Sequence, residues 1–159
     1  MTGETDTAAS GTLDPEDRRR LAAELFNFTW TLLEKLDSTP EDDDRTLHAA
    51  HASRFQWDEV GGAQQLAVGE WQCSRVYAVL GRAEPSLHHA RRALEIAEAG
   101  DVPNWVTASA YEALARANAV AGDREEARRF AALAREPCDR IAEPEDREVI
   151  EGDLATLPI

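Results

Sequence analysis

The sequence YAVLGRAEPSLHHARRALE, residues 77–95, has the pattern of two helical segments joined at a glycine. Gly81 ends the first segment. Ser86, Ala90 and Ala93 follow at spacings of three or four, so they share one face of the second helix. Small side chains on one face let two helix backbones approach closely. The stretch therefore predicts a pair of closely packed antiparallel helices.

A second stretch, ARANAVAGDREEARRFAALAREP at residues 115–137, repeats this pattern at an offset of 41 residues. The offset aligns Gly81 with Gly122, each at the end of a predicted first helix. It also aligns several other sets of residues: Ala49, Ala90 and Ala131; Ala52, Ala93 and Ala134; Leu25 and Leu66; Trp30 and Trp71. A fixed period of this length is typical of helical-repeat proteins.

The two stretches resemble tetratricopeptide (TPR) repeats, with Tyr77 four residues before Gly81 and small residues after it. The chain is also similar to small uncharacterised bacterial proteins of this helical-repeat kind. The resemblance covers about residues 70–137. It departs from the family in its period, which is longer than the usual ~34 residues, and in Asn118, which replaces the aromatic residue. The first pair, residues 15–58, keeps only the alanine rhythm.

The resemblance implies an all-α fold, namely a right-handed α-solenoid of three antiparallel helix pairs with a C-terminal capping helix. The alternative is an ordinary helical bundle in which the alanines align by chance. No segment alternates polar and apolar residues with a period of two, so we expect no strands. Start signals such as Asp14-Pro15 and stop signals such as Gly100 divide the chain. The predicted helices are 15–36, 40–59, 63–81, 84–99, 103–121, 124–141 and 144–156.

The length of 159 residues suits one domain, which we place at 14–159. Residues 1–13 are small, polar and aperiodic, and we expect them to be a disordered tail. They show neither the cationic start nor the apolar run of a secretion signal, and no apolar stretch is long enough to span a membrane. We therefore expect a cytoplasmic protein in which Cys73 and Cys138 are free thiols.

The charge balance bears on the class of partner. Seventeen Lys and Arg residues face 31 Asp and Glu residues, giving a net charge of −14. Because phosphate backbones and anionic lipid surfaces are bound mainly through Lys and Arg, this balance argues against both nucleic acid and membrane as partners.

In the TPR-like register, the first helix of each pair contributes one row of residues to a concave groove. These positions are Asn27, Trp30 and Glu34, then Val68, Trp71 and Arg75, then Ser109, Glu112 and Arg116. Neighbouring packed helices lie ~8–10 Å apart, so Trp30 and Trp71 should be side by side, as should Arg75 and Arg116. Two aromatic rings and two guanidinium groups suit a peptide, since Arg binds a carboxylate with two parallel hydrogen bonds.

The predicted ligand-binding residues are therefore Asn27, Trp30, Trp71, Arg75, Glu112 and Arg116. A different reading of the same residues stays open. The tryptophans would then pack between helices, and the arginines would pair with Glu70 or Glu112.

Histidines provide a second candidate site, because His48 and His51 lie three residues apart on one helical face and His89 aligns with His48 in the repeat. These three side chains are the candidate metal ligands. Equivalent positions on neighbouring helices start ~8–10 Å apart, whereas zinc needs every ligand within ~2.1 Å, which weighs against a shared metal. The alternative is half-buried histidines bonded to backbone or carboxylate groups.

No catalytic motif accompanies these residues. Glu-x-x-His pairs of di-iron bundles, HExxH, GxSxG and the phosphate-binding GxxxxGK[ST] are all absent from the sequence. We expect no cofactor, and a non-catalytic module that holds a protein or peptide partner, or a small ligand, in its concave groove. The alternatives are a metal-dependent or small-molecule enzyme that uses the histidines, and a structural homodimer formed through an exposed apolar helix face.

Overall fold

The computed structural model describes residues 13–159 and has no strand among them, which confirms the all-α prediction. These described residues form seven helices: α1 (Pro15–Leu33), α2 (Pro40–Val60), α3 (Ala63–Val79), α4 (Ala83–Ala99), α5 (Asn104–Ala121), α6 (Arg124–Asp139) and α7 (Pro144–Ala155). Every predicted bound is within three residues of the observed one. The tail predicted at 1–13 lies outside the described residues, apart from the exposed, non-helical Leu13.

Side-chain caps fix where several helices begin. Asp14 Oδ1 accepts a hydrogen bond of 2.9 Å from the backbone N–H of Asp17, and Pro15 follows it as the first residue of α1. Thr39 and Asp42 form a reciprocal capping box at the start of α2. Each cap satisfies N–H groups that have no partner within the helix, which explains why the sequence located these starts correctly.

Two glycines fix where first helices end. Gly81 and Gly122 have φ values of 71° and 84°, in the left-handed region that glycine adopts without steric cost. Gly122 is the C-cap residue of α5, and Gly81 lies just after Leu80, the C-cap residue of α3. Their alignment in the sequence thus reflects equivalent turns in the structure.

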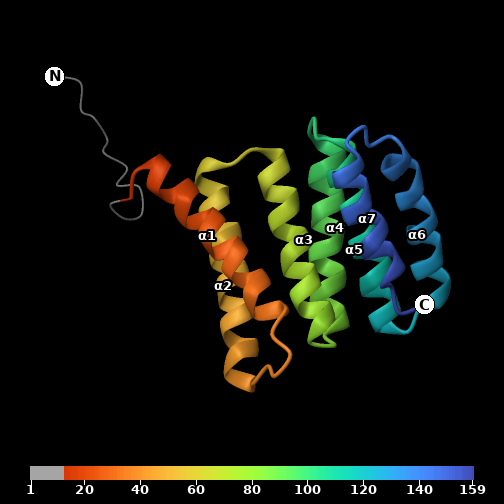
Figure 1. Cartoon of the computed structure of the whole chain (residues 1–159), viewed down its shortest axis with the longest axis horizontal. Helices are drawn as coiled ribbons and strands as arrows, with labels where there is room; N and C mark the ends of the chain where they lie inside the picture. Colours follow the sequence, from red (N-terminus) through yellow and green to blue (C-terminus); the bar gives the residue numbers. More distant parts are fainter. Residues whose placement is uncertain (1–12) are drawn as a thin grey trace.

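The helices pack in chain order. α1 packs on α2, α3 on α4 and α5 on α6, and the three pairs are joined by α2–α3 and α4–α5 contacts. The first helices also touch one another, α1 with α3 and α3 with α5, while α7 lies against both α5 and α6. Figure 1 shows the same order from α1 at one end to α6 at the other, with α7 drawn in front of α5.

Alanines make up much of the buried core. Ala90, Ala93 and Ala134, three of the alanines aligned by the repeat, are at most 1% exposed. Their small side chains allow close packing of neighbouring helices, as the sequence predicted. No helix within residues 13–159 has both the length and the apolar character needed to cross a membrane.

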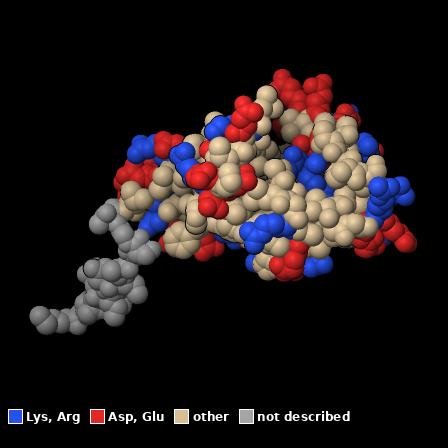
Figure 2. All heavy atoms as spheres, turned by 90° about the horizontal axis from the view of Figure 1, so that it is seen from below, with Lys and Arg blue, Asp and Glu red and all other residues tan. Residues whose placement is uncertain are grey.

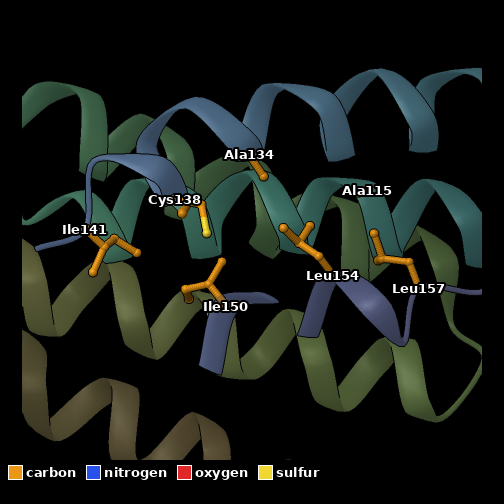
Figure 3. Close-up of a cluster of buried hydrophobic side chains, with 8 residues drawn as sticks. Ala115, Ala134, Cys138, Ile141, Ile150, Leu154 and Leu157 are labelled. Carbon is orange, nitrogen blue, oxygen red and sulfur yellow. The ribbon is translucent and has the colours of Figure 1, made fainter. Parts of the chain in front are cut away.

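The last helix is built into this core. Ile150, Leu154 and Leu157 are at most 9% exposed and form one cluster with residues of α5 and α6. Figure 3 shows these three side chains directed towards Ala115, Ala134, Cys138 and Ile141. Helix α7 therefore covers apolar surface that α5 and α6 would otherwise expose to water.

Candidate functional site

The two predicted groove tryptophans lie side by side. Trp30 on α1 and Trp71 on α3 have ring centroids 5.4 Å apart with planes tilted by 43°. Both rings are partly exposed. This is the neighbour relation expected from their 41-residue spacing, and it leaves aromatic surface open to solvent.

Glu112 on α5 lies at the centre of a network formed by other predicted site residues. It is 1% exposed, and its Oε2 accepts a hydrogen bond of 3.1 Å from Trp71 Nε1. Its Oε1 accepts from Arg116 Nε at 2.7 Å and from Arg75 Nη2 at 3.3 Å. A carboxylate this deeply buried needs such partners, because removing an unpaired charge from water is very costly. The sequence left two interpretations of Arg75 and Arg116 open, ligand binding or pairing with an internal carboxylate, and in the structure both pair with Glu112.

The C-terminal end of α7 completes the network. Arg75 Nη2 donates to Asp153 Oδ1 at 3.1 Å. Arg116 Nη2 donates to the Asp153 carbonyl and to Thr156 Oγ1, both at 2.9 Å. Both guanidinium groups are thus used within the chain. Burial raises the pKa of Asp153, and Glu112 adds to this effect while Arg75 opposes it.

Arg75 also contacts the two tryptophans. Its Cζ atom lies 5.5 Å from the ring centroid of Trp71 and 5.8 Å from that of Trp30. Cations are attracted to aromatic faces at such distances. The aromatic pair and the buried ion network are therefore one continuous cluster.

A hollow of about 360 Å³ lies beside this cluster, and we call it the α7 hollow. Its lining is largely apolar and comes from α1, α3, α5 and α7. The lining residues are Phe26, Trp30, Val68, Trp71, Trp105, Ser109, Asp146, Val149, Ile150 and Asp153.

A smaller hollow of about 180 Å³ adjoins it, and we call it the α1 hollow. Phe26, Val68 and Trp105 line both hollows. The α1 hollow adds the polar side chains of Asn27, Gln64 and Gln65, together with Ala23 and Trp57. All four tryptophans of the chain therefore line one or other of these adjoining hollows.

Other hollows of similar size differ in character. One between α4, α5 and α6 is bordered by Arg91, Glu95, Glu98 and Glu126, and one beside α1–α3 is bordered by Lys35 and Asp43. Neither contains a tryptophan. The α7 and α1 hollows are the stronger candidate for recognition, because apolar pockets with few polar groups are typical of binding sites.

The remaining groove positions differ in exposure. Asn27 is exposed at the α1 hollow, Val68 is half-buried between the two hollows, and Ser109 is buried beneath the α7 hollow. Glu34 lies just past the end of α1 and is exposed.

Sequence reasoning missed Trp57, Trp105, Asp146 and Asp153. The signal for Asp153 was present, because it lies 41 residues after Glu112, just as Glu112 lies 41 residues after Trp71. Trp105 lies one helical turn before Ser109, so extending each groove row by one turn would have included it.

The histidine cluster lies on α2, α3 and α4. His89 Nδ1 is 2.6 Å from Glu70 Oε2, and Glu70 Oε1 accepts from Arg54 Nε at 3.1 Å. His51 Nε2 is 2.8 Å from the Tyr77 hydroxyl, and the rings of His51 and His89 have centroids 5.3 Å apart. Partial burial of the ring lowers the pKa of His51, and the neighbouring His89 lowers it further.

Of the three candidate metal ligands, the structure brings the rings of His51 and His89 together. His48 and His51 are both exposed, and His89 is half-buried. Within residues 13–159, no group of three or more His, Cys, Asp and Glu side chains is placed to hold a metal ion. Burial would raise the pKa of Glu70, but its hydrogen bonds and charge interactions with His89 and Arg54 lower it overall. Burial raises the pKa of the nearby thiol of Cys73 to about 12, so this thiol stays protonated and is a poor nucleophile at neutral pH.

Known proteins offer no further guide to the site. Comparisons with protein-family models, curated proteins and solved structures find no match.

Proposed function

We propose that this chain is a TPR-like α-solenoid that acts as a non-catalytic interaction module and binds a segment of a partner protein. The binding surface is the face on which the first helices α1, α3 and α5 meet α7, which we take as the concave face. The observation that carries the proposal is that all four tryptophans line the two adjoining hollows on this face. Partly exposed aromatic clusters are typical of interaction sites, where they supply most of the binding energy.

The contacts between first helices support the solenoid arrangement. Positions 30, 71, 112 and 153 follow one another at 41-residue spacing, and their side chains form a connected row. Trp30 touches Trp71, Trp71 donates to Glu112, and Arg75 bridges Glu112 to Asp153. Equivalent positions on successive first helices are neighbours in a helical repeat. On this view α7 occupies the place of a fourth first helix, which makes it the capping helix.

Within this site we assign different tasks to the predicted residues. Arg75, Glu112 and Arg116 stabilise the surface from below, since their charged groups are paired inside the chain. Trp30, Trp71 and Asn27 face the ligand. The Asn27 and Gln64 amides of the α1 hollow offer donors and acceptors for the backbone of an extended peptide. Gln65 offers its amide N–H groups, since its Oε1 accepts from the Gly62 N–H at 2.9 Å.

A metal-dependent or small-molecule enzyme based on His48, His51 and His89 is the alternative function. Its two central histidines are already bonded to Tyr77 and Glu70, so they favour a structural role for the cluster. Elemental analysis of untagged protein tests the alternative: about one equivalent of a transition metal per chain would support it.

The experiment that tests the proposal uses a phage-displayed library of random dodecapeptides, selected on the wild-type protein. Enriched peptides are synthesised and titrated while tryptophan emission is recorded, since every tryptophan lies at the hollows. Val149 and Val79 form a matched pair for substitution, as they are 63% and 60% exposed and line different hollows. Val149→Arg should abolish binding by filling the α7 hollow, and Val79→Arg should leave it intact. Failure to enrich any peptide, or equal binding by both variants, would contradict the proposal.

A further inference from the structure

The charged groups that line the α7 hollow all have the same sign. Its lining includes two carboxylates, Asp146 and Asp153, and no Lys or Arg side chain. The two aspartates are seven residues apart on α7, with Val149 and Ile150 between them, so all four belong to one helical face. This face presents acidic groups at its ends and apolar groups at its centre.

The two carboxylates differ in their partners. Asp153 is held by Arg75 at 3.1 Å, and its side chain is 23% exposed. Asp146 lies in the first turn of α7 and is exposed. Asp146 is therefore the carboxylate that remains open to a ligand.

Opposite this acidic helix face lie four aromatic rings, those of Phe26, Trp30, Trp71 and Trp105. The faces of aromatic rings carry partial negative charge, so rings and carboxylates together attract a cation. Arg75 already shows this chemistry beside the hollow, because its guanidinium group lies over two of the rings while donating to Asp153.

The charge of the whole chain acts in the same direction. A net charge of −14 speeds the encounter with a cationic partner and disfavours an anionic one. Figure 2 shows acidic side chains in several patches over one face of the molecule.

We infer that the α7 hollow takes a basic side chain, Lys or Arg, of the bound protein segment. Such a side chain has an apolar stem and a charged head, which suits an apolar hollow with a carboxylate at its edge. The stem packs against the rings of Trp30 and Trp105, and the head lies near Asp146. This inference rests on the proposed function. It predicts a basic residue in the bound segment, whereas Arg75 and Arg116, had they been free to bind a ligand, would have favoured an acidic one.

The test uses the peptides enriched from the random dodecapeptide library. We expect one position to be enriched in Lys or Arg. Replacing that residue with norleucine, which keeps the stem but removes the charge, should weaken binding about fivefold or more, and replacing it with Glu should weaken binding further. Raising the salt concentration should weaken binding of the basic peptide and should not weaken binding of the norleucine peptide.

Variants of the protein provide the second arm. Asp146→Asn should weaken binding of the basic peptide about fivefold and leave the norleucine peptide unchanged. Glu148→Gln is the matched control, because Glu148 is exposed on α7 and is not part of the hollow's lining. It should leave both peptides unchanged.

The outcomes separate the inference from the proposed function. Enriched peptides that lack a basic residue, or that bind wild type and Asp146→Asn equally, would overturn the basic side chain while the interaction module stands. If no peptide is enriched, the proposed function fails and the inference fails with it.

Discussion

Trp71 Nε1 donates a hydrogen bond of 3.1 Å to Oε2 of Glu112, which lies 41 residues later in the chain and is 1% exposed. The bond joins an open aromatic surface to a buried carboxylate. Glu112 also holds Arg75 and Arg116, and through Arg75 it is connected to α7. The proposed binding surface and helix α7 are thus stabilised by the same buried network.

Removing the charge of Glu112 should destabilise the fold. Glu112→Gln leaves two largely buried guanidinium groups with less negative charge, and we expect a loss of about 3 kcal/mol in the free energy of unfolding. Urea unfolding followed by circular dichroism measures it. Glu136→Gln is the control, because the Glu136–Arg140 pair is 72% and 66% exposed and should contribute less than about 1 kcal/mol. Equal losses in the free energy of unfolding would show that the buried network contributes no more to stability than an exposed ion pair.

Arg75→Glu should likewise impair folding. It would place three carboxylates together, at positions 75, 112 and 153, where Arg75 now bridges two. We expect a marked drop in the melting temperature and in helical content. A variant that melts like wild type would show that Arg75 is available to a ligand and does not stabilise the fold.

Helix α7 should contribute strongly to stability through its apolar face. Leu154 is 6% exposed, and Leu154→Ala should cost about 2–5 kcal/mol in the free energy of unfolding. Leu36 is 98% exposed, so Leu36→Ala should change it by no more than about 0.5 kcal/mol. If Leu154→Ala were as mild as the control, α7 would not be part of the cooperative core.

The histidine cluster should make stability depend on pH. The pKa of His51 is lowered in the folded state from its ordinary value of 6.5, so between those two values the unfolded chain binds more protons. The free energy of unfolding should therefore fall as the pH drops below about 6.5. His51→Gln should reduce this dependence. His88→Gln should not, because it leaves His51 and its contact with the Tyr77 hydroxyl in place. Identical pH profiles for wild type and His51→Gln would contradict the assignment.

Both thiols should be free and poorly reactive in the folded protein. Cys73 and Cys138 are free, and each is 1% exposed. Burial raises the pKa of both thiols, that of Cys73 to about 12. A thiol-specific reagent at pH 8 should label neither quickly, and should label both after unfolding without reductant. Rapid labelling of the folded chain would show that the thiols are accessible.

Local signals in the sequence were sufficient to predict the helices. Asp14, Thr39, Gly81 and Gly122 act through backbone hydrogen bonds and φ values that depend on nearby residues only. The 41-residue spacing also predicted that Trp30 would lie beside Trp71.

The partners of the charged side chains could not be predicted in the same way. The sequence offered Arg75 and Arg116 either to a ligand or to an internal carboxylate, and the choice depended on how deeply Glu112 is buried. The role of α7 required knowing that Asp153 reaches Arg75, a contact between residues 78 positions apart. The α1 hollow also depends on where Trp57 of α2 lies after folding, which no local pattern specifies.

Binding of a protein segment at the two hollows is tested most directly by a nuclear magnetic resonance titration with an enriched peptide. The titration follows the four indole N–H signals. We expect the signals of Trp30, Trp57 and Trp105 to shift, and that of Trp71 to shift less because its N–H is bonded to Glu112. Trp→Phe variants assign each signal. Peptide binding that shifts none of the four indole signals would contradict the proposed binding site, since the segment would then lie elsewhere on the molecule.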